Sequence, residues 1–197
     1  MNSNFNAVDL NLIQVHDSSF PIGTYSHSYG MESYTQDGRI TKADEFLEFA
    51  SNYLIENLAI NDAIFIRQAF QATKDQDIKR LKELDEINGA LRLAKESREA
   101  SISTGRQFLR TLSNLYPDNE FIQEWDDLVR KRVVGGHYDI TYGIYAALFD
   151  IDINAAVQMY LYSTINTLIV NAVRSVPFGQ NTGVRLMHEM IPLIMEE

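Results

Sequence analysis

A long apolar stretch towards the C-terminal end decides the fold class of this chain. Residues 155–173 read AAVQMYLYSTINTLIVNAV, without the strict alternation that is typical of a half-buried strand. Gln158, Asn166 and Asn171 interrupt the run, whereas a membrane span prefers a cleaner apolar segment of about 20 residues. We therefore predict a buried helix near 155–173 in a soluble protein that does not cross a membrane.

Helical spacing of apolar residues continues on the N-terminal side of this segment. Leu10, Ile13 and Val15 predict a short helix that ends near Asp17. A second helix is predicted over about 26–36, ended by Asp37-Gly38, where the glycine is free to take a positive φ. A third helix follows Thr41, which resembles a capping box with Asp44. Asn61 is placed to cap the helix after that.

The middle of the chain carries a seam in which the spacing alternates by three and four residues. Its members are Leu91, Ala94, Arg98, Ser101, Gly105, Phe108, Leu112 and Leu115. A glycine inside a helix costs about 1 kcal/mol relative to alanine, so Gly105 predicts tight packing against a second element. Gly135-Gly136 then breaks the pattern, and residues 142–149 read as a short amphipathic segment.

The last helix is expected to follow a loop over residues 175–183. Its predicted inward face holds Val184, Met187, Ile191 and Ile194. Pro192 lies inside this pattern and should end or kink the helix. With no convincing strand, no repeat and no long linker, we predict an all-α fold, a single-domain multi-helix bundle over residues 1–197.

Composition limits the classes of function. The 197 residues include no cysteine and carry a net charge of −10. The absence of cysteine excludes disulfides and thiolate chemistry, and the acidity disfavours nucleic-acid binding. An acidic surface suits a basic protein partner or a cation carrier, or simply keeps the protein soluble. We expect a cytoplasmic protein, because residues 1–6 are polar and lack the pattern of a signal peptide.

The search for catalytic or ligand-binding motifs gives little. The chain has no phosphate-binding loop with its lysine, and none of the four histidines forms a pair spaced for metal binding. The segment 179–183 before a helix offers backbone donors to an anion but lacks a specifying lysine. A nucleophile–base–acid set drawn from Ser18, His27 and Asp17 is the enzyme alternative.

Four segments, in order along the chain, resemble one known family. LIQVHDSSFPIGTYSHSYGME (12–32) is similar to the N-terminal signature of the UreF family, and NAVRSVPFGQ (171–180) to its C-terminal block. Between them, SREAS (97–101) with Gly105-Arg106, and GHY (136–138) with Tyr142-Gly143, match the family's central elements. This colinearity over nearly the whole chain makes the resemblance specific.

The resemblance implies an all-α urease accessory protein without catalytic activity. Members of this family bridge a scaffold protein, UreD (also called UreH), and the GTPase UreG on apo-urease, and they modulate the GTPase during nickel insertion. No cofactor is expected to bind stably, because Ni²⁺ is handled by the complex. A homodimer is also expected.

The resemblance places partner-binding residues in two segments punctuated by glycine and proline. We predict that residues 174–185 dock the scaffold protein and order on binding, and that residues 18–29 help to form the dimer or the GTPase-facing surface. The predicted partner-binding residues are Ser18, Pro21, Gly23, Tyr25, His27, Ser28, Glu32, Arg174, Pro177, Phe178, Gly179, Gln180 and Arg185. The alternatives are a small hydrolase that uses the Ser18/His27 cluster and a purely structural helical scaffold.

Overall fold

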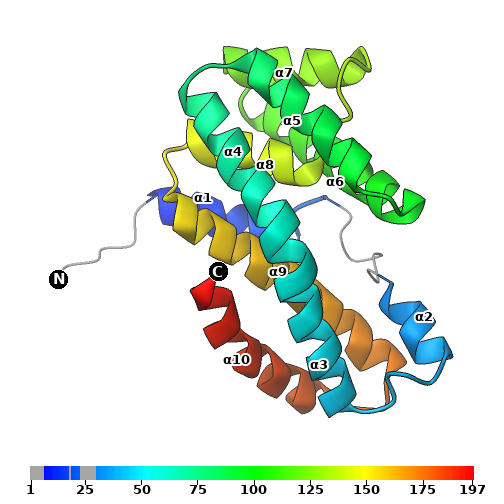
Figure 1. Cartoon of the computed structure of the whole chain (residues 1–197). Helices are drawn as coiled ribbons and strands as arrows, with labels where there is room; N and C mark the ends of the chain where they lie inside the picture. The colour runs from blue at the N-terminus through cyan, green and yellow to red at the C-terminus, as the bar shows by residue number, and fades with distance from the viewer. Residues whose placement is uncertain (1–6, 18, 23–29) are drawn as a thin grey trace. The chain divides into compact units, whose positions relative to one another are not determined.

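Helices account for all regular structure in the part of the chain that the computed structural model describes, residues 7–17, 19–22 and 30–197 (Figure 1). No strand occurs in these residues, so the prediction of an all-α fold is confirmed. The elements are α1 (Ala7–His16), α2 (Met31–Gln36), α3 (Ala43–Tyr53), the π-helix η2 (Leu54–Asp62), α4 (Ala63–Lys74), α5 (Ile78–Leu91), α6 (Lys95–Leu115), α7 (Glu120–Arg130), α8 (Tyr138–Leu148), α9 (Ile153–Ser175) and α10 (Gln180–Glu196).

The chain divides into two compact units. Unit 1 comprises Met1–Gly23 and Ile64–Ala156, and unit 2 comprises Thr24–Ala63 and Val157–Glu197. The expectation of one domain over residues 1–197 stays a prediction. None of the described helices is both long and apolar enough to cross a membrane.

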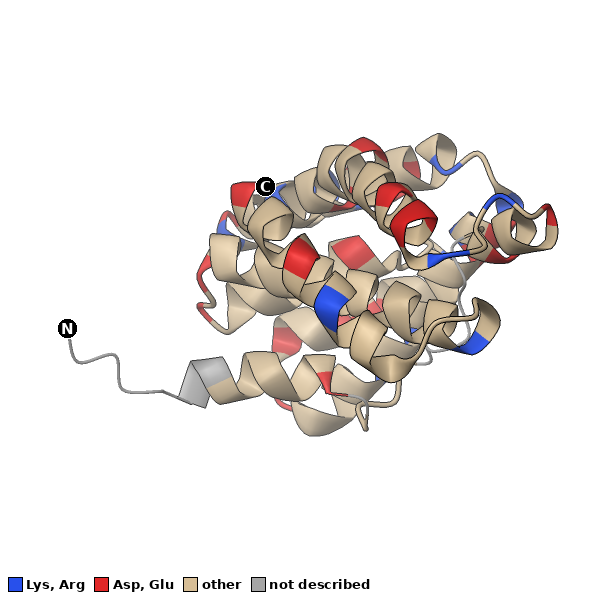
Figure 2. Cartoon of the chain, turned by 90° about the horizontal axis from the view of Figure 1, so that it is seen from below, with Lys and Arg blue, Asp and Glu red and all other residues tan. Residues whose placement is uncertain are grey.

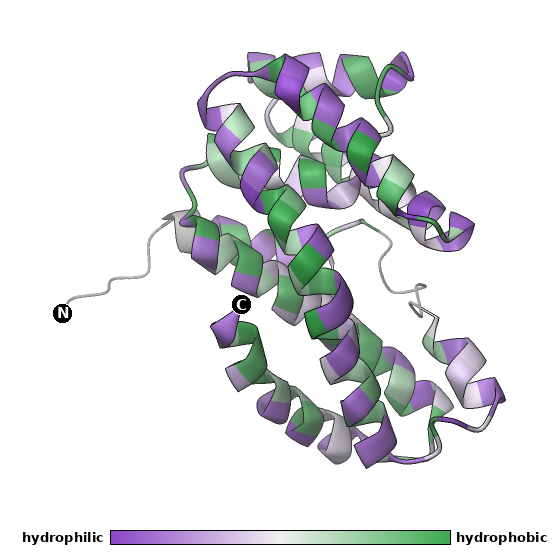
Figure 3. Cartoon of the chain, viewed as in Figure 1, coloured by the Kyte–Doolittle hydropathy of each residue, from purple (hydrophilic) through white to green (hydrophobic). Residues whose placement is uncertain are grey.

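The core of unit 1 forms where α6 packs against α7 and α8. Bands of apolar and polar residues alternate around α6 and α7 in Figure 3. Their inward side chains include Phe108, Leu112 and Trp125, which are almost fully buried. Every residue from Tyr138 to Ala147 on α8 is also buried, so the prediction of an amphipathic segment here was wrong. A helix covered on all sides loses the polar face that amphipathicity requires.

Gly105 brings α6 into contact with the backbone that leads into α8. A Cβ atom at Gly105 would lie 2.1 Å from the carbonyl oxygen of Gly136 and 2.7 Å from backbone atoms of His137 and Tyr138. Only glycine permits this approach without displacing the main chain. The tight packing predicted for Gly105 is confirmed.

The start of the predicted seam was wrong. Leu91 is the last residue of α5, and Arg92 leaves the helical region with φ −78° and ψ 82°. The Arg92 side chain donates back to Asn88 Oδ1 at 2.8 Å, and its carbonyl oxygen accepts from Arg98 Nη1 at 2.7 Å. These side-chain bonds stabilise a turn between α5 and α6. Hydrophobic spacing cannot reveal it, because Leu91 and Arg98 lie seven residues apart whether or not the helix is interrupted between them.

In unit 2, α3 packs against α10. The buried residues of α10 are Gly183, Leu186, Met187, Met190 and Ile194, whereas Val184 is 72% exposed and Ile191 40% exposed. The predicted face is therefore confirmed for Met187 and Ile194 and wrong for Val184 and Ile191. Pro192 does not end the helix, which continues to Glu196. Its missing N–H falls near the C-terminal end, where few later bonds depend on it.

The helix caps predicted at Thr41 and Asn61 were both wrong. Thr41 pairs with Glu45 rather than Asp44, since its N–H and Oγ1 each donate to Glu45 Oε2 at 2.9 Å. Asn61 caps nothing, because it lies inside η2 and the helical backbone continues into Ala63. The expected turn at Gly38 is confirmed, with φ 71°.

The buried helix expected near 155–173 corresponds to α9. Its fully buried residues include Ala156, Val157, Leu161, Ile165, Leu168 and Ala172, while Asn154, Tyr162 and Asn166 are exposed. The loop expected over residues 175–183 is shorter than predicted. α9 runs to Ser175 and α10 begins at Gln180, so residues 176–179 alone connect them.

Candidate partner-binding site

The turn between α9 and α10, with the helix ends beside it, holds the C-terminal residues predicted to bind a partner. The N–H of Val176 donates to Ala172 O at 2.8 Å and that of Phe178 to Val176 O at 2.7 Å. Gly179 is the N-cap of α10, and its carbonyl oxygen accepts from the N–H of Gly183 at 3.2 Å. The turn is thus fixed by its own backbone.

The apolar residues of this turn pack within unit 2. Val176 is 4% exposed, and the ring of half-buried Phe178 lies 5.9 Å from that of Phe46 on α3. A Cβ at Gly183 would meet Val173 Cγ2 at 2.9 Å, so α10 begins in close contact with α9. Val176 and Phe178 therefore pack within this chain.

Five of the six predicted C-terminal residues, in the turn and in the two helices beside it, are exposed to solvent. Arg174, Pro177, Gly179, Gln180 and Arg185 are all exposed. Arg185 pairs with Glu189 one turn further along α10, with Nη1 2.6 Å from Oε1. Charged and amide groups are thus more exposed here than the Phe178 ring.

The N-terminal segment is described in part. Ser18, Gly23, Tyr25, His27 and Ser28 lie outside the described residues, so their predicted roles and the hydrolase alternative stay predictions. Pro21 is exposed between two buried anchors, Phe20 and Ile22, and Glu32 is exposed in the first turn of α2.

A histidine beside this segment anchors α1 in unit 1. Tyr142 Oη donates to the carbonyl oxygen of Ala156 at 2.9 Å and lies 2.8 Å from His16 Nε2. Since burial raises the pKa of Tyr142 well above its usual range, the hydroxyl keeps its proton and accepts from His16 Nε2–H. His16 Nδ1 is buried without a hydrogen-bond partner, and burial lowers the pKa of His16 to about 4.

His16 should make the stability of the protein depend on pH. Between pH 6.5 and about 4 the unfolded chain binds a proton at His16 that the native protein does not, so the free energy of unfolding should fall as pH falls. The expected loss is about 3 kcal/mol over this range. Denaturant titrations of wild type and His16→Gln at pH 7, 5.5 and 4.5 measure it. His188→Gln, at an exposed position of α10, is the control and should retain the wild-type slope.

Sequence reasoning missed a buried polar cluster that joins α5, α6 and α8. Asp85 is 3% exposed; its Oδ1 accepts from the N–H groups of Gly136 and His137 at 3.0 and 2.9 Å, and its Oδ2 from Gly135 at 2.5 Å. Asp139, fully buried, accepts from Asn88 Nδ2 at 2.5 Å and Arg92 Nη2 at 3.1 Å.

Ser101 of α6 completes this cluster. Its Oγ lies 3.0 Å from His137 Nδ1 and accepts from the N–H of Tyr138 at 3.3 Å. The segments 97–101 and 136–138, noted for their family resemblance, therefore meet where α8 begins. One signal was available, because Asp85 shares the apolar stripe of α5 with Leu81 and Leu84.

Within the described part of the chain, no three His, Asp or Glu side chains are grouped to hold a metal ion. The cluster around Asp85 ties helices together, and the α9–α10 turn presents polar groups to solvent. In its described residues the protein is thus all-helical, with buried polar groups that join its helices.

The comparisons with known proteins agree with this class. The UreF family model matches residues 40–191, and the chain belongs to the UreF family. The urease accessory protein UreF of Sporosarcina pasteurii is 36% identical over 166 residues, which cover 84% of this chain and 82% of that protein. That of Lachnoclostridium phytofermentans is 37% identical over 180 residues, covering 91% of this chain and 78% of that protein. That of Bacillus sp. (strain TB-90) is 33% identical over 187 residues, covering 95% of this chain and 82% of that protein.

Proposed function

We propose that this protein is a non-catalytic adaptor of urease maturation that acts in the cytoplasm. It joins the scaffold protein UreD/UreH and the GTPase UreG on apo-urease, modulates that GTPase, and so supports GTP-dependent nickel insertion. Nickel is the cargo of the complex rather than a cofactor held by this chain. The observation that carries the proposal is the match to urease accessory proteins UreF over most of both chains.

The α9–α10 turn is our candidate for the surface that docks the scaffold protein. Exposed Arg174, Pro177, Gln180 and Arg185 would make the contact, while Phe178 holds the turn against α3. This assignment changes the choice of test. Phe178→Ala would loosen the turn whether or not a partner binds, so a loss of binding in that variant would be ambiguous.

Arg174→Glu is the sharper variant, because Arg174 is exposed at the end of α9. Reversing a charge at an interface introduces like-charge repulsion as well as removing a contact. We expect at least tenfold weaker capture of UreD/UreH by the tagged protein in a pull-down at low salt. Arg110→Glu, at an exposed position of α6 in unit 1, is the control. Equal capture by Arg174→Glu and wild type would remove the turn from the interface.

Deletion of the gene tests the function as a whole. Urease activity should be lost and partly restored by excess nickel, and the apo-urease, UreD/UreH and UreG should copurify with the tagged protein. A purely structural scaffold without a role in maturation would leave urease activity unchanged. Copurification of none of these proteins would also contradict the proposal.

A further inference from the structure

Three aromatic rings form a row on the surface of unit 2. The ring of Tyr34 on α2 lies 5.0 Å from that of Phe49 on α3, and Phe49 lies 6.3 Å from Tyr53, with their planes only 8° apart. Tyr34 is 41% exposed, and the other two rings are half-buried. We call Tyr34, Phe49 and Tyr53 the aromatic row. Aromatic rings in such positions are enriched in the energetic centres of protein interfaces.

The backbone fixes where the row stands. Phe49 and Tyr53 are four residues apart and share one face of α3, while Phe46 and Ala50 point into the core. The turn after α2 holds Tyr34 in place, because the N–H groups of Arg39 and Ile40 both donate to its carbonyl oxygen, at 2.8 and 3.2 Å. The rings are therefore presented by ordered helices and lose little conformational entropy on binding.

The row already holds one cation. The guanidinium carbon of Arg39 lies 5.5 Å from the centre of the Tyr34 ring. This is the distance at which a cation is attracted to the negative face of an aromatic ring. Within this chain, the Tyr34 ring thus already lies in cation–π range of one guanidinium.

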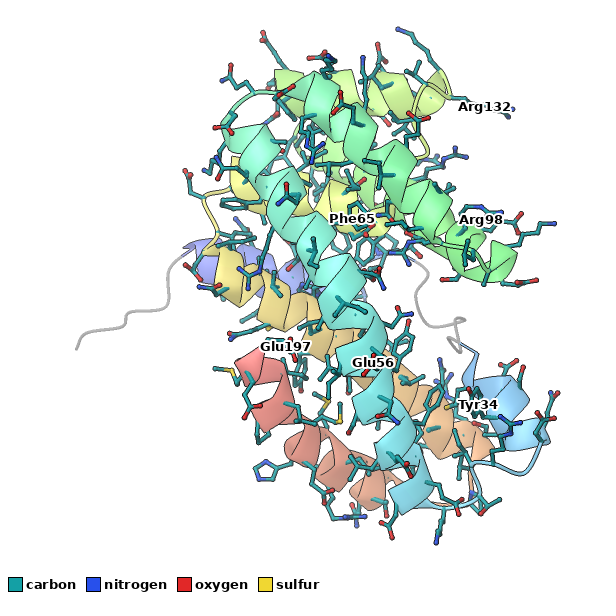
Figure 4. The ribbon with its side chains drawn as sticks, viewed as in Figure 1. Tyr34, Glu56, Phe65, Arg98, Arg132 and Glu197 are labelled. Atoms are coloured by element: carbon teal, nitrogen blue, oxygen red, sulfur yellow. The ribbon has the colours of Figure 1, made fainter. Side chains whose placement is uncertain are left out.

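Carboxylates outnumber bases on the helical stretch that carries Phe49 and Tyr53, and Lys42, just before it, pairs with Glu45, with Nζ 3.7 Å from Oε1. Residues 43–62 hold the acids Asp44, Glu45, Glu48, Glu56 and Asp62 and contain no lysine or arginine. Of these, Asp62 alone is buried. Glu45 lies one turn before Phe49, and Glu56 lies three residues after Tyr53; Figure 4 labels Glu56 and Tyr34. Figure 2 shows the acidic and basic residues along the ribbon.

We infer that the aromatic row and its carboxylates dock a basic, arginine-bearing segment of a partner protein. A guanidinium both stacks on rings and pairs with carboxylates, which a compact ammonium does less well. The acidic border would repel nucleic acid and a second copy of the same face. The inference rests on the proposed function, since the other urease maturation proteins and apo-urease are the partners in question.

Binding of purified UreD/UreH, UreG and apo-urease to the tagged full chain tests the inference. Tyr34→Ala and the double variant Glu48→Lys, Glu56→Lys should each weaken binding of one partner at least tenfold, and wild-type binding should weaken as salt rises. Tyr162→Ala is the aromatic control, because Tyr162 on α9 is 38% exposed. Glu96→Lys, Glu99→Lys on α6 is the control for charge, and both controls should bind within twofold of wild type.

A photo-crosslinking residue in place of Tyr34 identifies the occupant. The expected adduct is a partner peptide rich in arginine. An adduct to a second copy of this chain, or to a segment without basic residues, overturns the inference, as does binding of both variants within twofold of wild type. In these cases the proposed function stands, because wild type still binds its partners. Failure of wild type to bind any of the three proteins would instead contradict the proposed function.

Discussion

Asp85→Ala is expected to lower the free energy of unfolding by about 4 kcal/mol. The carboxylate accepts from three consecutive backbone N–H groups, those of Gly135, Gly136 and His137. Removing it leaves these donors without their acceptor in a region where Asp85 is only 3% exposed. Each buried donor left unsatisfied costs about 1–3 kcal/mol, partly relieved where water enters. Urea denaturation followed by far-ultraviolet circular dichroism measures the change.

Asp85→Asn separates the contributions of the two oxygens. The amide oxygen can still accept from Gly136 and His137, but the amide nitrogen would face the N–H of Gly135, donor against donor. The loss should therefore be smaller than in Asp85→Ala. Asp77→Ala is the control on the same helix, where an exposed carboxylate accepts one N–H, that of Arg80, as the N-cap. Its loss should be about 1 kcal/mol. An Asp85→Ala loss no larger than that of Asp77→Ala would refute this account of the cluster.

Helix formation was predictable here because it depends on spacing between neighbours in sequence. Asp77 and Asn119 begin α5 and α7 by accepting from the N–H groups of Arg80 and Ile122, as expected of residues that favour caps. The buried face of α10 was harder to predict, because two stripes of this helix, offset from each other by about one residue, are both apolar. Leu186 and Met190 on one compete with Val184 and Ile191 on the other, and only packing against α3 and α9 decides between them.

The hydrogen-bond partners of Asp85 could not be predicted from the sequence, for a different reason. The Asp85 carboxylate accepts from main-chain N–H groups about 50 residues away. Nearly every residue has such a donor, so residue identity does not show which one is used. The glycines at 135 and 136 predicted the helix break but not the carboxylate that binds the backbone there. The partner-binding residues stay predictions, although packing has already separated Phe178, which contacts Phe46, from Arg174 and Arg185, which face solvent.

Gly105→Ala is expected to destabilise the protein by about 3 kcal/mol or more, despite the better helix propensity of alanine. Propensity alone would stabilise α6 by about 1 kcal/mol. Against this, the new Cβ would lie 2.1 Å from the carbonyl oxygen of Gly136, and a main-chain atom cannot rotate away. The helix must separate from the start of α8, which disturbs the bonds to Asp85 and Ser101. Thermal denaturation should show the loss directly.

Gly183→Ala is the matched comparison, because its Cβ would meet a side-chain atom, Val173 Cγ2, at 2.9 Å. A valine can shift by a few tenths of an ångström, so the propensity gain should offset much of the clash and leave a smaller loss than at Gly105. Gly105 and Asp85 act on the same segment, Gly135 to Tyr138. Once Gly105→Ala has displaced that segment, Asp85→Ala should cost less than it does in the wild type, so the double variant should lose less than the two single variants together. Strictly additive losses would mean that the two residues stabilise independent parts of unit 1.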